Sequence, residues 1–446
     1  SLENLLSKAK SLAKKGNIAE AVKLYKTILS DFPKNVRAQK GLEKLQTYSG
    51  KNPPQEEIKN LINAYNKKQF SESIQVAQSI LNKYPQAIIV WNILGGAYEA
   101  LGELKQAIIA FKKVTELNPN YVDGYYNLGV CLQNYGNIEH SIKAYQKCIS
   151  INKNYAESYI NLGIALRQLG KTEDSIEVFT KILLIKPDFA EAYYHLVPSL
   201  RGIYFKKHNS DLLNIVTSLL DKKTLVRPRD IIDAGLSLLK LDTKLKKYLE
   251  PDYLDGEELK PLEVIADLSK FPLLHKLMSV CPISDLELER LLKKLRAKLI
   301  MSIDDYIGSS DLLAFQSALA LQCFTNEYIY DKTKDEEKAL LLLEETVKLD
   351  ISNNNSPSAH KILTLASYKP LNSYEWSSLL LVTNEIKDVF TRQVIEPHKE
   401  VKLGKFLPLL NNITNKVSSK VRDQYEVSPY PRWVNLKLVL NPAPIS

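Results

Sequence analysis

The sequence predicts an all-α protein in which a superhelix of helical hairpins is followed by an irregular α-helical domain. Two observations predict this class. Aromatic, glycine and small residues recur every 34 residues between positions 88 and 189, a period typical of stacked two-helix units. Beyond about residue 224 this period stops, but apolar residues keep the three-to-four spacing of amphipathic helices. A chain of 446 residues is also too long for a single hydrophobic core.

Three units share one phase, over residues 88–121, 122–155 and 156–189. The first carries, in order, Trp91, Leu94, Gly95, Tyr98, Ala107, Phe111 and Pro119. The same places in the other two hold Tyr125, Leu128, Gly129, Gly136, Ser141 and Tyr145, and then Tyr159, Leu162, Gly163, Gly170, Ser175, Phe179 and Pro187. This pattern resembles the tetratricopeptide repeat. Small residues at its eighth and twentieth positions are expected to let two helices approach closely, and Lys153, in place of proline, is expected to leave the turn intact.

The flanking segments keep only part of the pattern. Residues 2–35 and 54–87 are expected to be degenerate repeats, and 190–223 a distorted capping unit, since Val197 replaces the glycine and Pro198 lies within a helix. We therefore predict a degenerate N-terminal hairpin over 1–48, a linker over 49–56 and an array over 57–223. An α-helical middle domain over 224–425 and a connector with a tail over 426–446 follow.

Stacked hairpins curve so that their first helices line a concave wall, where an extended peptide or a helix can bind. The predicted partner-binding residues are Asn92, Tyr126, Asn127, Asn161, Arg167 and His195. Asn127 and Asn161 are in register and resemble the asparagine ladder of O-linked N-acetylglucosamine transferases, which implies contact with peptide amides. The alternative is that these side chains only face solvent. The carboxylate clamp of co-chaperone repeats is not matched, because Asp123 and Glu157 stand where cations are needed.

Charge and composition exclude several classes of function. The net charge is +9, but the lysines are scattered over nearly every helix, which argues against a nucleic-acid interface. No apolar stretch is long enough for a membrane helix, and the N-terminus does not read as a signal peptide. We therefore expect a cytoplasmic protein with no membrane or nucleic-acid partner. The four separated cysteines have no metal-ligand spacing and are expected to be buried thiols.

The second half of the sequence contains few features that are typical of a catalytic site. Its glycines are isolated, so no glycine-rich cofactor loop is expected. The single histidines His275, His360 and His398 are expected to be structural or at the surface. A polar stripe on one predicted helix, formed by Gln322, Cys323, Asn326 and Glu327, is expected to be a helix-packing network, with a hidden transferase or hydrolase site as the alternative.

The segment RDQYEVSPYPRW, over residues 422–433, differs from its surroundings by its aromatic and proline content. Together with residues 237–242 and 319–330, it resembles a bacterial family in which a tetratricopeptide array and a helical middle domain precede a class I S-adenosylmethionine-dependent methyltransferase domain. The connector residues are Tyr425, Pro429, Tyr430, Pro431, Arg432 and Trp433. We expect a rigid connector packed on the helical domain, and the alternative is a lip over an active site.

The resemblance implies a cofactor loop after Trp433, and the residues up to Ser446 do not contain one. We therefore expect a non-catalytic scaffold without cofactor or metal, formed from the recruiting part of a methyltransferase-like protein. The alternatives are a truncated methyltransferase and an enzyme with its site in the helical domain. A glycosyltransferase is suggested only by the asparagine ladder.

Overall fold

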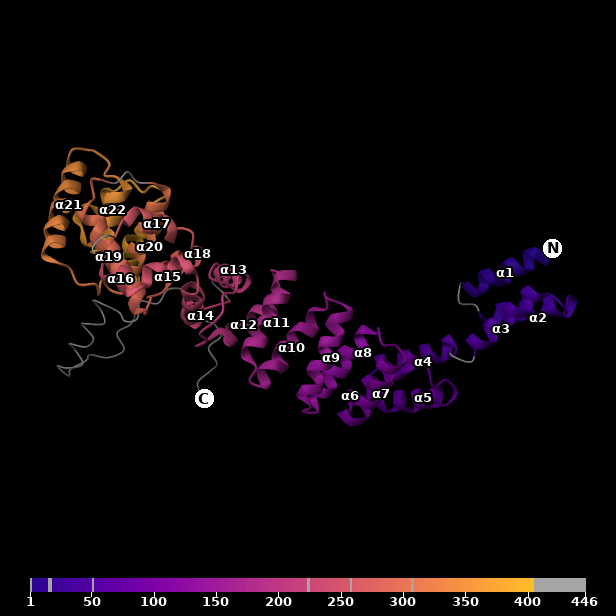
Figure 1. Cartoon of the computed structure of the whole chain (residues 1–446). Coiled ribbons are helices and arrows are strands. Elements are labelled where there is room, and N and C mark those ends of the chain that lie inside the picture. The colour runs from indigo at the N-terminus through magenta and orange to yellow at the C-terminus, as the bar shows by residue number, and fades with distance from the viewer. Residues whose placement is uncertain are drawn as a thin grey trace. The chain divides into compact units, whose positions relative to one another are not determined.

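A computed structural model describes residues 2–14, 18–49, 52–222, 225–256, 259–305 and 309–404. The chain forms two compact units, residues 1–185 and 186–446, which Figure 1 colours from indigo to magenta and from magenta to yellow. The described residues form helices and contain no strand, which confirms the all-α class. No helix in these ranges is long and apolar enough to cross a membrane. All six predicted connector residues, from Tyr425 to Trp433, lie outside the described residues.

The first unit begins with three helices and continues as four hairpins. The three helices are α1 (Leu2–Lys14), α2 (Ile18–Asp31) and α3 (Val36–Ser49), which share a small core around Ala9, Ala21 and Tyr25. The hairpins pair α4 (Gln55–Asn66) with α5 (Phe70–Lys83), α6 (Ile88–Ala100) with α7 (Leu104–Leu117), α8 (Val122–Asn134) with α9 (Ile138–Ile151) and α10 (Ala156–Gln168) with α11 (Thr172–Ile185). Each of the three regular repeats thus contains one complete hairpin.

A glycine facing an aromatic ring sets the distance between the two helices of each regular hairpin. A Cβ atom built on Gly163 would lie 2.4 Å from Cζ of Phe179, and one on Gly129 would lie 2.5 Å from Cε1 of Tyr145. Real Cβ atoms do not approach other atoms so closely, so the ring occupies the space that a side chain would need. This contact confirms the expected role of the small residue at the eighth position.

The turn between the two helices of a hairpin requires a left-handed backbone conformation. Gly102, Gly136 and Gly170 adopt φ values of +77°, +88° and +74° at this place. Lys68 occupies the equivalent place between α4 and α5, with φ of +60°. Glycine takes up this conformation without steric cost, whereas a residue with a Cβ is strained there. The degenerate repeat therefore keeps the turn with a less suitable residue.

The turn that ends a repeat forms with or without proline. Helices α7 and α9 end with Asn118 and Asn152 as their C-caps. The side chain of each asparagine accepts a hydrogen bond of 3.0 Å from the backbone N–H two residues later. Lys153 follows Asn152 at the place where Pro119 follows Asn118, so the expectation that the lysine leaves the turn intact is confirmed.

Neighbouring hairpins share their cores. One cluster joins Phe111 of α7 with Leu128 and Cys131 of α8, and another joins Tyr145 of α9 with Leu162 of α10. No hairpin buries its apolar face alone, which is the basis of cooperativity in repeat arrays. Successive first helices also touch each other, namely α4 with α6, α6 with α8 and α8 with α10, whereas successive second helices approach less closely. The first helices therefore line the inner side of the array.

The second unit consists of short helices. They are α12 (Ala190–Leu200), α13 (Ser210–Leu219), α14 (Pro228–Lys240), α15 (Thr243–Leu249), α16 (Pro251–Asp255), α17 (Pro261–Leu268), α18 (Pro272–Val280), α19 (Leu286–Met301), α20 (Ser310–Thr325), α21 (Lys334–Ser352), α22 (Ala359–Ala366), α23 (Lys387–Phe390) and α24 (Glu396–Gly404). Two short 3₁₀ helices, Leu371–Ser373 and Glu375–Leu379, and a π-helical turn, Thr391–Ile395, connect the last of them.

Proline starts several of these helices. Pro228, Pro251, Pro261 and Pro272 each occupy the first turn, where the missing N–H has no intrahelical partner to lose. Helix α19 begins without a proline. Asp285 is its N-cap, because its carboxylate accepts a hydrogen bond from the N–H of Leu288 at 3.1 Å.

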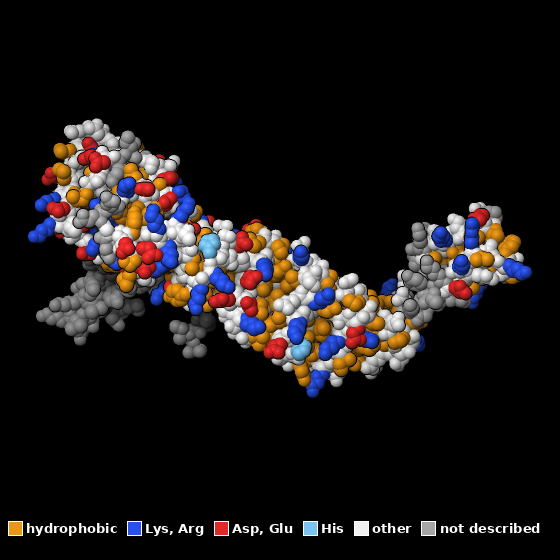
Figure 2. Space-filling model, viewed as in Figure 1, with side chains coloured by type: hydrophobic (Ala, Val, Ile, Leu, Met, Phe, Trp, Pro, Cys, Tyr) orange, Lys and Arg blue, Asp and Glu red, His pale blue; other side chains and the backbone are white. Residues whose placement is uncertain are grey.

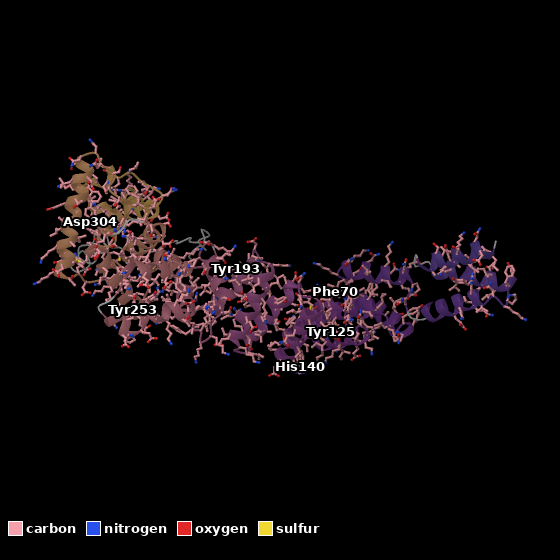
Figure 3. The ribbon with its side chains drawn as sticks, turned by 45° about the horizontal axis from the view of Figure 1, so that its top comes forward. Phe70, Tyr125, His140, Tyr193, Tyr253 and Asp304 are labelled. Atoms are coloured by element: carbon pink, nitrogen blue, oxygen red, sulfur yellow. The ribbon has the colours of Figure 1, made fainter. Side chains whose placement is uncertain are left out.

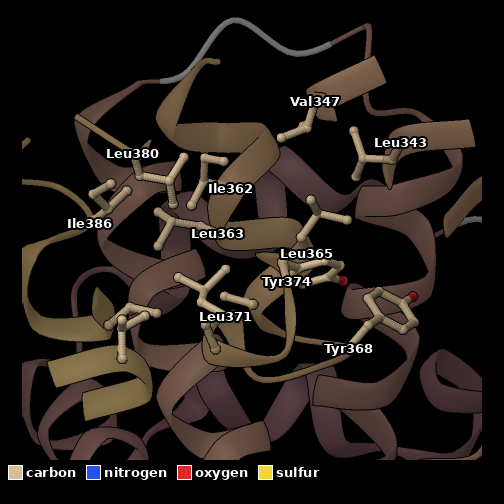
Figure 4. Close-up of a cluster of buried hydrophobic side chains, with 14 of the residues drawn as sticks. Leu343, Val347, Ile362, Leu363, Leu365, Tyr368, Leu371, Tyr374, Leu380 and Ile386 are labelled. Atoms are coloured by element: carbon tan, nitrogen blue, oxygen red, sulfur yellow. The ribbon is translucent and has the colours of Figure 1, made fainter. Parts of the chain in front are cut away.

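One hydrophobic core of the second unit lies among α20, α21, α22 and the segment that follows α22. Buried Leu343, Ile362, Leu363, Leu371 and Leu380 meet there (Figure 4). The four cysteines of the chain are free and buried, two in each unit, which confirms the prediction of buried thiols. Burial raises the pKa of the Cys281 thiol to about 12, so this thiol stays protonated.

The segment predicted to be a capping repeat forms two helices in the second unit. Pro198 lies inside α12, and residues 201–209 join α12 to α13, a longer connection than residues 135–137 between α8 and α9. Both helices pack on α14, and α13 also packs on α18. The domain limits drawn from the sequence at residues 48, 56, 223 and 425 stay predictions.

We expect Gly163→Ala to lower the free energy of unfolding by about 1–3 kcal/mol, because the new methyl group overpacks the contact with Phe179. Urea unfolding followed by circular dichroism measures this change. The control is the same substitution in a Phe179→Leu variant. The smaller leucine leaves space for the new methyl group, so Gly163→Ala should lower the free energy of unfolding by less there. Equal effects in both backgrounds would show that the ring does not set the spacing.

We expect Lys68→Gly to raise the free energy of unfolding by up to about 1 kcal/mol, because relief of the left-handed strain outweighs the greater entropy of the unfolded chain. The reciprocal change, Gly136→Ala, introduces left-handed backbone strain without a steric clash, since nothing lies within 4 Å of the new Cβ atom. Thermal melts of the two variants should shift in opposite directions. A shift in the same direction would contradict this account of the turn.

Candidate functional site

The candidate site is the inner surface made by first helices in the first unit, which we call the first-helix wall. We define it by polar and aromatic side chains of α6, α8 and α10 and of the residue before α10. The members are Asn92, Glu99, Asp123, Tyr126, Asn127, Gln133, Tyr155, Glu157, Asn161, Arg167 and Gln168. Tyr125 and His140, on α8 and α9 of the central hairpin, locate this region in Figure 3.

Side-chain amides connect successive repeats along the wall. Asn127 Nδ2 donates to Asn92 Oδ1 at 3.3 Å, and Asn161 Nδ2 donates to the hydroxyl of Tyr126 at 3.4 Å. In both pairs the partners are 35 residues apart, so the same contact is repeated one unit further along. The Asn161 amide also bonds to the hydroxyl of Tyr145, and both asparagines are half-buried. The amide oxygens of Asn127 and Asn161 take no part in these bonds, so each can accept a hydrogen bond beside a partly water-excluded surface.

Two tyrosine rings lie together between these amides. The ring centroids of Tyr126 and Tyr155 are 5.2 Å apart, and Tyr126 is 6.3 Å from Tyr145. The hydroxyl of Tyr155 donates to Asp123 Oδ1 at 3.1 Å, and that of Tyr145 donates to Gln133 Oε1 at 2.9 Å. Each hydroxyl therefore fixes the orientation of its ring. The result is a preorganised aromatic surface at the junction of two repeats.

Carboxylates border this aromatic surface. Asp123 and Glu157 are exposed, whereas Glu99 is half-buried. Burial raises the pKa of the Glu99 carboxyl, and its hydrogen bond with the Cys131 thiol acts in the opposite direction. Burial also raises the pKa of Tyr126, and the negative charges of Glu157 and Glu99 add to this effect. Both carboxylates thus lie within electrostatic reach of the Tyr126 ring.

The structure brings four of the predicted partner-binding residues together. Asn92, Tyr126, Asn127 and Asn161 form the two inter-repeat bonds. Arg167 lies in the last turn of α10, and His195 lies on α12 in the second unit, where its ring packs against Tyr194 with centroids 5.2 Å apart. The assignment of all six residues to partner binding stays a prediction.

Sequence reasoning missed three groups of the wall: Tyr155, Glu99 and the glutamine pair. Gln133 and Gln168 are also 35 residues apart, with Nε2 of Gln133 donating to Oε1 of Gln168 at 3.0 Å. Comparing polar residues at this spacing, one more than the repeat length, would have found the pair. Tyr155 precedes its helix, so a search confined to helices could not find it.

The polar stripe on α20 is engaged in packing between helices. In the orientation that satisfies the Gln322 amide, its nitrogen donates to the carbonyls of Met278 and Cys281 at 3.2 and 3.1 Å, and its oxygen accepts from the N–H of Ile283 at 2.9 Å. Cys323 is fully buried, and burial raises the pKa of its thiol to about 12. Asn326 Oδ1 accepts from the N–H of Tyr328 at 3.1 Å. These contacts support the interpretation as a packing network.

Beside this stripe lies a buried ion pair. Arg296 Nη2 is 3.6 Å from Glu336 Oε1, and both side chains are almost completely buried. The Arg296 guanidinium lies 4.2 Å from the ring centroid of Tyr368, whose hydroxyl donates to Glu336 Oε1 at 2.7 Å. The small space lined by Arg296, Gln316 and Thr364 is too narrow for a water molecule. These groups contact one another inside the core, and the space between them has no room for a substrate.

His360 belongs to the same core. Its Nδ1 lies 2.8 Å from Gln316 Oε1, and its Nε2 lies 3.1 Å from the carbonyl oxygen of Ile303. Burial lowers the pKa of His360, which favours the neutral ring. This histidine is structural, as its isolated position in the sequence predicts.

Profiles of known families match four segments of the chain. Profiles described as tetratricopeptide repeat match residues 3–35, 122–155 and 144–177, and a profile described as TPR repeat matches residues 95–134. The chain therefore carries tetratricopeptide repeats. No curated protein sequence matches it.

Solved structures of repeat proteins are similar to part of the chain. A crystal structure of MamA is 24% identical, covers 42% of this chain and 96% of its own, and has a TM-score of 0.31. YrrB, described as a TPR protein with an unusual peptide-binding site, is 18% identical, with coverages of 42% and 88% and a TM-score of 0.28. The Sgt2 TPR domain from Aspergillus fumigatus is 20% identical, with coverages of 28% and 86% and a TM-score of 0.27.

Proposed function

We propose that this protein is a non-catalytic interaction scaffold that binds an extended peptide along the first-helix wall. The observation that carries the proposal is the pair of half-buried amides, Asn127 and Asn161, repeated one unit apart on the inner side of the array. An asparagine side chain offers both a donor and an acceptor, as a peptide bond does. Such residues recognise a peptide backbone whatever its side chains are.

The spacing of the wall suits an extended peptide. Packed helices lie about 8–10 Å apart, and an extended chain advances about 3.3 Å per residue. Roughly every third peptide bond would therefore meet a new amide on the wall. A protein ligand is favoured over nucleic acid, since Lys and Arg side chains lie singly among acidic and neutral groups on the face shown in Figure 2.

Asn127→Ala and Asn161→Ala should each weaken peptide binding about fivefold to tenfold, because each removes a hydrogen bond worth about 1 kcal/mol. An array of unstructured 12-residue peptides identifies binders, and fluorescence anisotropy then measures their Kd. Gln146→Ala is the matched control, because it removes an exposed amide from the second helix α9. Failure of every peptide to bind, or equal losses with the control, would refute the proposal.

We further propose that the scaffold is the recruiting portion of a methyltransferase-like protein. This part of the proposal is supported by the sequence resemblance of residues 237–242, 319–330 and 422–433. The glycines after residue 200 are Gly202, Gly235, Gly256, Gly308 and Gly404, all isolated. Binding of a nucleoside cofactor normally requires a glycine-rich turn against which its phosphate or ribose can pack.

Titration calorimetry of the 446-residue chain with S-adenosylmethionine should show no binding heat. Saturable binding would refute the non-catalytic assignment. The coding sequence beyond Ser446 tests the recruiting role: an α/β domain with a GxG loop there would support it, and a following domain of another class would contradict it and leave the peptide-binding proposal unaffected.

A further inference from the structure

We propose that the partner of the first-helix wall is an extended peptide segment rich in lysine or arginine. This inference rests on the proposed peptide-binding function and adds the chemistry of the ligand. It is carried by the distribution of charge between the two faces of the array and by the surroundings of Tyr126 and Tyr155.

Lys and Arg side chains are divided unevenly between the first and second helices of the regular repeats, whereas carboxylates occur on both. The ionisable acids of α6, α8 and α10 are Glu99, Asp123 and Glu157, and the only Lys or Arg in these fully described helices is Arg167. The second helices α7, α9 and α11 carry six lysines and five carboxylates, namely Lys105, Lys112, Lys113, Lys143, Lys147 and Lys181 with Glu116, Glu139, Glu173, Asp174 and Glu177. The inner wall is therefore acidic, although the chain as a whole carries a net charge of +9.

Asp123 bonds to one of the paired tyrosines, and two more carboxylates lie within electrostatic reach of the other. Glu99 and Glu157 both act electrostatically on Tyr126, and Asp123 accepts the hydroxyl hydrogen of Tyr155. The two rings are 5.2 Å apart. Negative charge is thus placed at the edges of an aromatic surface that is already oriented by its own hydrogen bonds.

This arrangement is complementary to a long cationic side chain. The methylene groups of a lysine or arginine can lie on the tyrosine rings, and the cation is attracted by the ring faces and by the carboxylates. Acidic peptides would instead be repelled, and neutral peptides would gain only the amide contacts of Asn127 and Asn161. The carboxylates therefore make the wall selective for basic peptides, whereas the asparagines alone would bind any peptide backbone.

The probes are three matched 12-residue peptides that carry lysine, glutamine or glutamate at alternate positions between serines. Anisotropy titrations of the full chain in 50 mM NaCl should give a Kd for the lysine peptide about tenfold lower than for the glutamine peptide, and weakest binding for the glutamate peptide. In 500 mM NaCl the advantage of lysine should fall to about twofold, since salt screens exposed charges.

Two double variants with the same change of net charge separate the wall from the rest of the surface. Asp123→Asn with Glu157→Gln should remove most of the preference for lysine, and Asp123→Asn keeps an acceptor oxygen for Tyr155. Glu139→Gln with Glu173→Gln, on the second helices, should retain the preference. Melting curves confirm that both variants are folded.

Every other outcome of these experiments overturns the inference, and one of them also overturns the proposed function. Equal binding of the lysine and glutamine peptides, or tighter binding of the glutamate peptide, overturns the inference and leaves the peptide-binding function standing. Equal losses in the two double variants also overturn it, because net charge alone would then explain the preference. If none of the three peptides binds, both the inference and the proposed function fail.

Discussion

The contact of a glycine with an aromatic ring is the constraint on which the array depends. At Gly95, Gly129 and Gly163 the facing ring takes the space of a side chain, so the two helices of each regular hairpin pack closely at the same place. Similar hairpins then stack in the same register, and equivalent residues fall one repeat apart. The 35-residue amide contacts are a consequence of that regularity, since a small change of spacing in one hairpin would break the hydrogen-bond register.

Much of the first unit could be predicted from the sequence because its structure is local and periodic. The hairpins, the small residue at the eighth position and the register of Asn127 with Asn161 all follow from residues within one or two repeats. The sequence could not show that Asn127 bonds to Asn92, or that Tyr155 stacks with Tyr126. These contacts depend on side-chain directions at a junction between hairpins, which a linear pattern does not specify.

The second unit shows the opposite case. Its helices could be predicted from apolar spacing and from prolines at their first turns, but its buried polar group could not. Arg296 is enclosed by the carbonyls of Tyr330 and Asp331, the carboxylate of Glu336 and the ring of Tyr368, which come from separate segments. No periodicity connects these positions. A buried charge of this kind requires several partners at once, so only the folded arrangement explains why an arginine is tolerated there.

The charge of the whole chain is a poor guide to the charge of its candidate site. A net charge of +9 suggests an anionic partner, yet the helical lysines of the regular repeats lie on second helices, while the first-helix wall carries carboxylates. The separation follows from the architecture, because the two helices of a hairpin expose different surfaces and can vary independently. The first-helix wall can therefore carry negative charge in a chain of positive net charge. The electrostatic potential at a bound peptide depends mainly on the few charged groups within a Debye length.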